Sequence, residues 1–364
     1  MTSRSSGGRR AAVVGTGLIG ASIALGLRSH GWHVTGSDID SSVSEEALAI
    51  GALDAIGCDP EAEVTFVATP AGAVVDEASR VLSRGDLRSD ALVTDVAGVK
   101  SEISAAISDP RFVGGHPMAG SEQLGVQGAD PGIFVGATWV LTPVAATNPD
   151  DYARLRSVVG LLGAEVVALS PEQHDELVAV VSHVPHLTAA VLMNLADQLA
   201  SEHAALLRLA AGGFRDMTRI AAGDSRIWPD ICAANAAAIV GTLDELLVSL
   251  AEVRDTVKAA DRGRLLDLLD RAGRARRSLP VGAAAPARLA EIRVPVQDRP
   301  GVVAEITTLA GDQGINILDL EIAHSSEGDQ GVLVLVVDAE GADRLKDALG
   351  ARSYRAVARL LDSP

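Results

Sequence analysis

The sequence has little cysteine and a deficit of basic residues. Only Cys58 and Cys232 occur among 364 residues, far apart, so no disulfide framework is expected and a reducing cytoplasm suits the chain. Lysine and arginine number 31 against 48 aspartate and glutamate residues, giving a net charge of −17. Nucleic acids and anionic membranes are therefore not expected as partners, and an anionic substrate requires a local cluster of basic groups.

Leader sequences and long apolar runs are also lacking. The N-terminal stretch MTSRSSGGRRAAVVGTGLIG breaks its apolar run with glycines, which is not the pattern of a signal peptide. Residues 177–196 carry no formal charge, but two histidines, a proline and an asparagine make them too polar for a lipid-facing helix. We expect a buried core helix in a soluble, cytoplasmic protein.

The pattern of strand-like and helical segments along the chain predicts three domains. β-type runs alternate with helical ones up to about residue 170, which predicts a Rossmann-type, doubly wound parallel α/β sheet. Residues 171–277 are helical in period without strand signals, residues 278–287 read as a linker, and residues 288–364 predict a ferredoxin-like βαββαβ unit. The strands expected in the first domain are AAVVG, HVTGSD, EVTFVATP, ALVTDVAG, RFVGGHP and ATWVLTP.

A glycine-rich turn predicts a dinucleotide site in the first domain. Gly15, Gly17 and Gly20 follow the first strand in G-x-G-x-x-G spacing and open a helix, which leaves N–H groups for a pyrophosphate. Asp38 ends the second strand, where an acid binds the adenosine ribose and favours NAD over NADP; Asp40 is the alternative. The expected NAD contacts are Gly15, Gly17, Leu18, Ile19, Gly20, Asp38, Thr69 and Asp95.

Four histidines invite two hypotheses. His183 and His186 at i, i+3, with His174 or His116, could form a metal site, but Pro185 lies between the pair and hydride transfer to NAD needs no metal. We therefore expect no metal. The alternative is a base with substrate-binding imidazoles, in which His183 is a core histidine and His174 is either a substrate contact or core.

Three segments carry a family resemblance. GGHPMAGSE, EQHDELVAVVSHVPHLTAA and GGFRDMTRIAAGDSRIWPDI resemble signature blocks of the prephenate dehydrogenase family, which includes arogenate dehydrogenases, and the similarity runs from about residue 11 to 269. The resemblance implies a Rossmann domain, an all-helical dimerisation domain and hence a homodimer. It also implies NAD-dependent oxidation of a cyclohexadienol at C4 with loss of the ring carboxylate as CO2. The product is 4-hydroxyphenylpyruvate from prephenate, or tyrosine from arogenate.

The same resemblance implies roles for individual residues. His116, between glycines at a strand end, binds the C4 hydroxyl and accepts its proton, for which a near-neutral imidazole suits. Arg219 binds a substrate carboxylate. Apart from the resemblance, Asp216 lies three residues before Arg219, where its carboxylate can orient the guanidinium. His186 contacts substrate, while Trp228 either lines the pocket or packs at the dimer interface.

Two further features concern basic and hydroxyl groups. Arg215 and Arg219 are four apart and share a helical face if this segment is one helix; Arg215 is expected to be a surface charge. The family pattern D-x-x-S-V-K reads DVAGVK here, with Gly98 at the serine position and the lysine kept at Lys100. Water or Ser101 replaces the missing hydroxyl, or the chemistry is slower.

The C-terminal region resembles an ACT domain, a ligand-binding regulatory module, in its segment VQDRPGVVAEITTLAGDQGINILDLEIAH. The D-R-P-G turn leaves backbone N–H groups at a helix start for an amino-acid carboxylate. Expected effector contacts, with tyrosine as the effector, are Asp298, Pro300, Gly301 and Asn316. The alternative is a structural module that binds nothing.

Three other functions stay open from sequence. Arogenate dehydrogenase is the nearest, because the two substrates differ only in a keto or amino group. A β-hydroxyacid dehydrogenase would need a catalytic lysine, and Lys258 in a charged helix is the only lysine between residues 171 and 277. A non-catalytic sensor of dinucleotide and amino acid is favoured only by Gly98.

Overall fold

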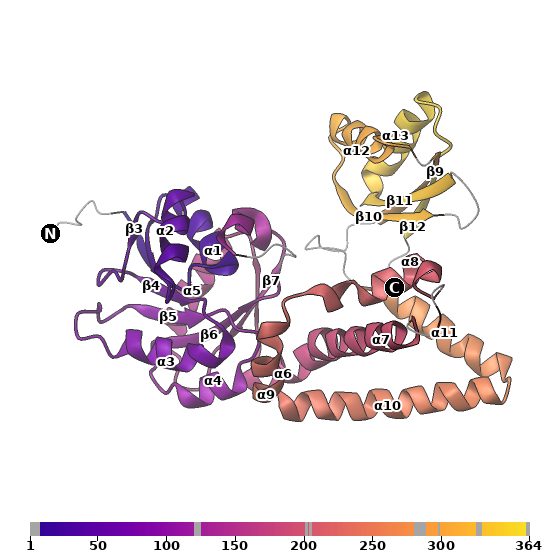
Figure 1. The fold of residues 1–364 in the computed structure, drawn as a ribbon. Coiled ribbons are helices and arrows are strands. Elements are labelled where there is room, and N and C mark those ends of the chain that lie inside the picture. Colours follow the sequence, from indigo (N-terminus) through magenta and orange to yellow (C-terminus); the bar gives the residue numbers. More distant parts are fainter. Residues whose placement is uncertain are drawn as a thin grey trace. The chain divides into compact units, whose positions relative to one another are not determined.

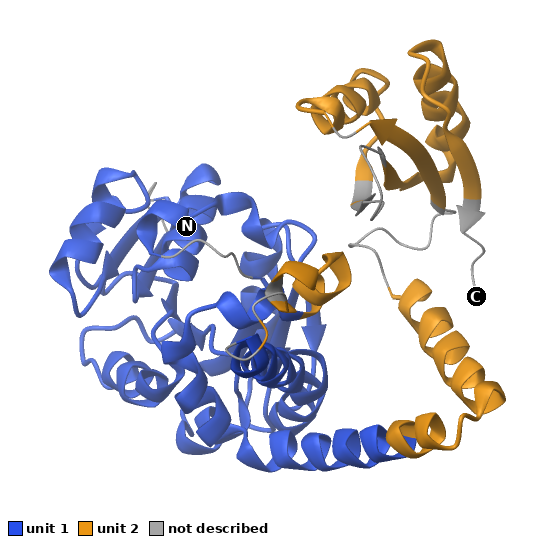
Figure 2. Ribbon diagram, turned by 45° about the vertical axis from the view of Figure 1, so that its right-hand side comes forward, with its two compact units in different colours: residues 1–202, 218–252 blue, residues 203–217, 253–364 orange. Residues whose placement is uncertain are grey.

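The computed structural model describes residues 8–119, 125–200, 203, 206–279, 289–297, 299–324 and 330–361. The chain forms two compact units, residues 1–202 with 218–252 and residues 203–217 with 253–364 (Figure 2).

An eight-stranded sheet is the centre of the first unit, in the order β3-β2-β1-β4-β5-β6-β7-β8 (Figure 1). Its strands are β1 (Arg10–Val14), β2 (His33–Ser37), β3 (Ala55–Ile56), β4 (Val64–Val67), β5 (Leu92–Asp95), β6 (Phe112–Pro117), β7 (Thr138–Thr142) and β8 (Glu165–Ala168). Every neighbouring pair is parallel except β6 and β7, which are antiparallel. The Rossmann-type sheet is confirmed, and the two strands that the sequence did not predict, β3 and β8, lie at its two edges.

Helices cover both faces of this sheet. Helices α1 (Leu18–Ser29), α2 (Ser41–Ala49) and α5 (Pro149–Leu161) share one hydrophobic core with the sheet, and α3 (Ala71–Leu82) and α4 (Ser101–Ala106) share the other (Figure 1). The strands between them are buried on both sides, as parallel strands are when helices cover both faces. The carboxyl ends of the strands therefore remain as the edge where a ligand can bind.

The second region is helical, as predicted. It comprises α6 (Pro171–Val178), a π-turn (Ala179–His183), α7 (Val184–Ala200), α8 (Gly212–Thr218), α9 (Trp228–Ala234), α10 (Ala236–Lys258) and α11 (Arg262–Arg277), with 3-10 turns at Leu206–Leu209, Arg219–Ala222 and Ser225–Ile227. Helix α6 begins at a capping box, in which Ser170 and Gln173 satisfy each other's backbone N–H groups and Pro171 occupies the first turn. Because the capping box sets the first residue of α6, it also sets the positions of His174 and Asp175 on this helix.

One helical stretch is long and apolar. By length and composition, Pro171–Ala200 in the described part of the chain could cross a bilayer, and 28% of its most apolar window is buried in the protein. Core helices of soluble proteins have the same length and hydropathy, so this is weak evidence for a span. His174 and Asp175 in its first turns are buried within the first unit.

The C-terminal domain has the predicted βαββαβ order. Its elements are β9 (Leu289–Gln297), α12 (Val302–Asp312), β10 (Ile317–His324), β11 (Gln330–Asp338), α13 (Ala339–Ala351) and β12 (Val357–Leu361). The antiparallel sheet runs β10-β11-β9-β12, and both helices pack on one face of it over a single core (Figure 1). The ferredoxin-like fold is confirmed.

Candidate active site

The turn between β1 and α1 is shaped for a pyrophosphate. Gly15 has φ +89°, and a Cβ built on it would lie 2.5 Å from the carbonyl oxygen of Ala68. A Cβ on Gly20 would lie 1.9 Å from the carbonyl oxygen of Gly15, so helix and strand touch there as closely as glycine allows. A Cβ built on Gly17 would meet no other group within 4 Å, and α1 has no side-chain cap and no acidic residue in its first turn. Open space and uncapped N–H groups meet at Gly17, as an anion requires.

The two aspartates that follow β2, Asp38 and Asp40, make different hydrogen bonds. The two carboxylate oxygens of Asp38 accept hydrogen bonds from the backbone N–H groups of Thr16, at 2.8 Å, and Asp40, at 3.1 Å. Asp40 instead caps α2, accepting from the backbone and hydroxyl of Ser42. Asp38 is therefore held beside the glycine turn while Asp40 is engaged in the cap, which favours Asp38 as the ribose ligand.

The other expected cofactor contacts differ in accessibility. Leu18 and Ile19 form the first turn of α1 and are partly exposed. The hydroxyl of Thr69, just after β4, is buried without a hydrogen-bond partner, which fits a polar group awaiting a ligand. Asp95 is fully buried and receives hydrogen bonds from Ala97 and Gly115 and an ion pair from Lys100. Its side chain lies beneath the site rather than on its surface.

His116 is the penultimate residue of β6, inside the strand rather than beyond its end. It pairs with Val140 of the antiparallel β7, and its ring is half-buried. A Cβ built on Gly98, after β5, would lie 3.7 Å from both Cε1 and Nε2 of His116. The residue that departs from the family pattern therefore lies beside the Nε2 edge of the imidazole.

Behind His116 lies a chain of polar side chains from α6. Nδ1 of His116 is 2.8 Å from Nε2 of His174, and Nδ1 of His174 is 2.8 Å from Oδ1 of Asp175. His174 is fully buried. Its ring lies behind the ring of His116, so of the two alternatives left by the sequence, substrate contact or core residue, its burial favours the core residue.

Asp175 is held by the start of α4. Its carboxylate accepts hydrogen bonds from the backbone N–H groups of Lys100 and Ser101, both at 2.8 Å. The side chain of Ser101 also helps to lower the pKa of the Asp175 carboxyl. Ser101 is thus engaged behind the imidazoles, which does not support it as the replacement for the hydroxyl missing at Gly98.

A buried ion pair lies under the same strand. Lys100 and Asp95 are both fully buried, and their Nζ and Oδ2 atoms are in contact. Burial lowers the pKa of Lys100, although the charge and hydrogen bond of Asp95 act in the opposite direction. Burial also lowers the pKa of His116 well below 6.5, and the neighbouring His174 and Lys100 lower it further. His116 is consequently neutral at neutral pH and able to accept a proton.

A second group of aromatic rings lies on the π-turn, α7 and α9. His186 stacks on Trp228 with ring centroids 3.7 Å apart, and His183 meets the edge of the same Trp228 ring at 6.1 Å. His183 is buried, and its Nδ1 is 3.2 Å from the side-chain amide of Asn235. His183 is thus a core histidine, while His186 is half-buried and its position is set by Trp228.

Arg219 begins a 3-10 turn rather than continuing α8. Helix α8 ends at Thr218, so the segment is not one continuous helix and the condition under which Arg215 and Arg219 would share a helical face is not met. The turn leads to Gly223, where a Cβ would lie 3.7 Å from Cε1 of His186, so the segment that carries the exposed Arg219 passes beside His186.

Arg215 and Asp216 both lie on α8, in the other compact unit. Arg215 is exposed and donates to the carbonyl of Ala210, as a surface charge would. Asp216 is also exposed, and its role toward Arg219 stays a prediction. Among the described residues, no group of three or more His, Cys, Asp and Glu side chains is arranged to hold a metal ion.

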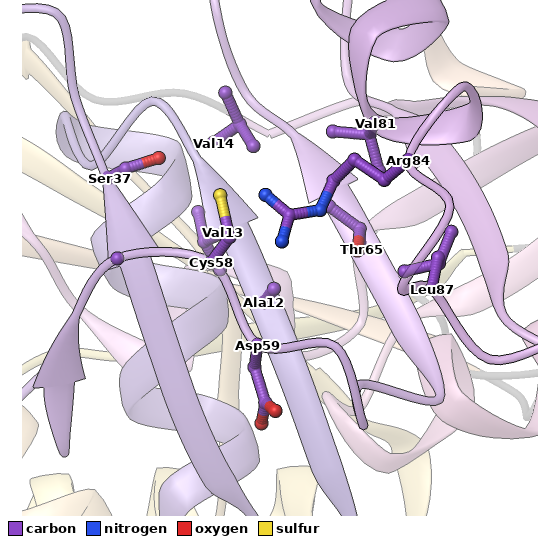
Figure 3. A pocket seen from close by; sticks show the side chains of 11 residues that line it. Ala12, Val13, Val14, Ser37, Cys58, Asp59, Thr65, Val81, Arg84 and Leu87 are labelled. Carbon is purple, nitrogen blue, oxygen red and sulfur yellow. The ribbon is translucent and has the colours of Figure 1, made fainter.

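Two cavities lie outside this constellation. The hollow in Figure 3, beside Cys58 and Arg84, measures about 10 Å³, space for at most one water molecule, and its Arg84 forms an ion pair with Asp86. A cavity of about 190 Å³ lies among α3, α4 and α9, and its charged lining residues, Glu102 and Asp230, are both acidic. Neither suits an anionic substrate.

Sequence reasoning missed Asp175 and Asn235. Asp175 directly follows His174 in the quoted segment, and this His-Asp dipeptide was the available signal. Asn235 carries no motif and is recognised only from its contacts, a 2.8 Å hydrogen bond to the carbonyl of Asp175 and the approach to His183.

Comparison with known proteins places the chain in a family. The nucleotide-binding domain of prephenate dehydrogenase matches residues 23–168, the dimerization domain of prephenate dehydrogenase matches residues 170–271, and the ACT domain matches residues 290–353. Prephenate dehydrogenase of Bacillus subtilis (strain 168) is 33% identical over 335 residues, which cover 88% of this chain and 90% of that protein.

Solved structures of prephenate and arogenate dehydrogenases are also similar to this chain. Prephenate dehydrogenase from A. aeolicus, in complex with hydroxyphenyl propionate and NAD+, is 27% identical with a TM-score of 0.70, over 76% of this chain and 100% of that one. Synechocystis arogenate dehydrogenase is 31% identical with a TM-score of 0.63, over 73% of this chain and 98% of that one. The chain therefore belongs to the prephenate dehydrogenase family of NAD-dependent oxidoreductases and carries a C-terminal ACT domain.

Proposed function

We propose that the chain oxidises prephenate with NAD, as a cytoplasmic homodimer, and releases 4-hydroxyphenylpyruvate and CO2. The observation that carries this proposal is the placement of His116 Nε2 beside Gly98 at the carboxyl edge of the Rossmann sheet. The family match supplies the reaction class, and the geometry supplies an imidazole that is neutral and can accept a proton at that atom.

The cofactor site has the features that NAD requires. Gly15, Gly17 and Gly20 leave space and N–H groups for the pyrophosphate, and Asp38 is fixed beside them for the adenosine ribose. Thr69 adds an unpartnered hydroxyl. Bound NAD supplies the hydride acceptor.

His116 moves the proton. When the hydride leaves C4, Nε2 of His116 takes the proton of the C4 hydroxyl. The bond between the ring and its carboxylate then breaks, its electron pair enters the ring, and CO2 leaves. The proton returns from Nε2 to the ring oxygen as the phenol forms, so the overall reaction neither gains nor loses a proton.

Arg219 and His186 bind the remainder of the substrate. A guanidinium matches a carboxylate with two parallel hydrogen bonds, and the turn that begins at Arg219 passes beside His186. Trp228 holds the imidazole of His186 by stacking. A dicarboxylate is thereby bound in a protein whose net charge is −17.

The test is direct. Purified protein mixed with NAD and prephenate should produce NADH absorbance, and His116→Asn should lower kcat by about 10²- to 10⁴-fold while NAD affinity stays the same. A loss of only two- or three-fold would assign the base to another residue. Arogenate serves as the second substrate, because a relative of similar identity is an arogenate dehydrogenase; faster turnover of arogenate would reassign the substrate.

The effector proposed for the ACT domain is tyrosine. Gly301 has φ +88° and opens α12 without a side-chain cap, and Pro300 precedes it. Asn316 is exposed just before β10. Asp298 lies outside the described residues. Uncapped N–H groups at the start of α12 supply donors for an amino-acid carboxylate.

A further inference from the structure

The polar chain behind His116 has an orienting function. We infer that His174 and Asp175 are positioning residues that fix the tautomer of His116 and stabilise its protonated form during the reaction. This inference rests on the proposed role of His116 as the base. The two residues act through His116, because His174 is fully buried and Asp175 nearly so.

The direction of each hydrogen bond follows from Asp175. An ionised carboxylate only accepts, so Nδ1 of His174 carries the proton of the 2.8 Å contact between them. With that one proton on the His174 ring, its Nε2 is an acceptor, so Nδ1 of His116 donates across the other 2.8 Å contact. Nε2 of His116 is left with its lone pair. This is the atom that lies beside Gly98, where the substrate hydroxyl is proposed to bind.

Asp175 stays ionised because its surroundings favour the charge. Burial alone would raise its pKa, but hydrogen bonds from His174, Ser101 and Lys100 lower it below the usual value. Two of these donors are backbone N–H groups at the start of α4, so the carboxylate also caps that helix. The cap anchors α6 to the Rossmann domain, and it thereby fixes His174 against the ring of His116.

The charge of Asp175 assists the base at the moment of reaction. Four charged or titratable groups face His116: His174, Lys100 and His183 lower its pKa, and Asp175 raises it. Lys100 forms an ion pair with Asp95, whereas Asp175 is directed toward the imidazoles. When His116 accepts a proton, the new cation is hydrogen-bonded to His174 and faces the carboxylate beyond it. Orienting partners of this kind change rates by an order of magnitude or more.

Asp175→Asn and His174→Gln test the inference in the full-length protein. Each should lower kcat by about 10- to 100-fold with KM for NAD within about two-fold of wild type. In Asp175→Asn the acidic limb of the kcat/KM profile should also move to lower pH, because the charge that raises the pKa of His116 is gone.

The matched control removes a helix cap away from the site. Asn148 caps α5 through a 2.8 Å hydrogen bond from Asp150, so Asn148→Ala costs stability and leaves kcat and the acidic limb unchanged. If Asp175→Asn behaves like Asn148→Ala, losing folded protein but retaining kcat and the position of the limb, Asp175 is a structural cap and the inference is overturned.

A spectroscopic measurement separates this inference from the proposed function. In histidine-labelled protein, ¹H–¹⁵N correlation spectra should show His116 as the Nδ1–H tautomer, assigned by the signals that disappear in His116→Asn. An Nε2–H tautomer would refute the orientation whatever the substrate. The wild-type protein could also show the Nδ1–H tautomer and oxidise neither prephenate nor arogenate. That result would refute the proposed function but would support the inferred orientation of His116.

Discussion

At the scale of single residues, Gly98 leaves the base without a neighbouring hydroxyl. A Cβ at this position would lie 3.7 Å from Nε2 of His116, an ordinary contact distance, so a serine side chain fits there. Its hydroxyl would reach the imidazole or the substrate oxygen. We expect Gly98→Ser to raise kcat/KM several-fold, up to about ten-fold, which corresponds to about 1.4 kcal/mol of transition-state stabilisation.

Gly98→Ala is the control for this change. It fills the same space without a hydroxyl, so it should leave kcat/KM at or below the wild-type value. Equal rates for the serine and alanine variants would show that water or the backbone already supplies the missing hydrogen bond.

Asp38 sets the choice of cofactor. Its carboxylate is fixed beside the glycine turn by the backbone N–H groups of Thr16 and Asp40, and there it repels a 2′-phosphate. Asp38→Ser should raise KM for NAD and lower the preference for NAD over NADP by about ten-fold or more. Steady-state comparison of the two cofactors measures this, with Asp40→Ser as the comparison, because serine removes the carboxylate of Asp40 but keeps a side-chain oxygen that can cap α2. An unchanged preference in Asp38→Ser, with a changed one in Asp40→Ser, would move the ribose contact to Asp40.

Site residues could be predicted from the sequence where a short, continuous sequence motif defines their role. Gly15, Gly17 and Gly20 are recognisable because a strand, turn and helix follow one another within a few residues. His174 is not recognisable in this way. It is 58 residues from His116, and only the folded chain shows that the two rings meet. The sequence leaves His174 as either a substrate contact or a core residue, and only the contact between the two rings shows that it lies behind His116.

At the scale of elements, the π-turn between α6 and α7 changes which side chains face the core. His174 and His183 are nine residues apart, which is about half a turn out of phase in a regular α-helix. One extra residue in the π-turn brings them closer in phase, and both are buried. Sequence periodicity alone could not show this, because it assumes an unbroken helix.

Other limits of the prediction also arise at element ends. Helix α8 stops at Thr218, so a spacing of four between Arg215 and Arg219 did not place them on one face. Strand β3 has only two residues, and β8 is mostly exposed at the sheet edge, so neither shows the buried apolar run of a central strand. The long central elements, with strong hydrophobic patterns, were predicted correctly.

Asn235 marks the break between α9 and α10 and joins three elements. Its buried amide donates to the carbonyl of Asp175 and lies 3.2 Å from Nδ1 of His183. Asn235→Ala leaves these acceptors without their donor, so we expect the free energy of unfolding to fall by about 1–3 kcal/mol. Urea denaturation of the wild type and the variant measures the difference.

The control is Asn194→Ala on the same helical region. Asn194 is exposed on α7, so its replacement should change the free energy of unfolding by less than about 0.5 kcal/mol. If both variants lose equal stability, the buried hydrogen bonds of Asn235 contribute nothing specific.

At the scale of the whole molecule, the candidate active site and the ACT domain belong to different compact units. The ACT domain has its own hydrophobic core, formed by β9, β11, α12 and α13. A regulatory ligand bound to it can act on catalysis only if it favours one state of the whole chain over another. The proposed effector, tyrosine, also resembles the product, so it has a second possible route through the active site.

Removing the ACT domain separates the two routes. A chain that ends at Leu279, just beyond α11, should retain catalysis and lose inhibition by tyrosine. Coupling between sites is typically about 1–3 kcal/mol, so inhibition of the full-length enzyme should be several-fold to about a hundred-fold. Gly301→Val complements the truncation at full length, because φ +88° strains a β-branched residue in the turn proposed to bind the carboxylate. Inhibition through the ACT domain must weaken in both variants, whereas competition in the active site must survive in both. Equal inhibition by tyrosine in all three proteins would exclude the ACT domain as the sensor.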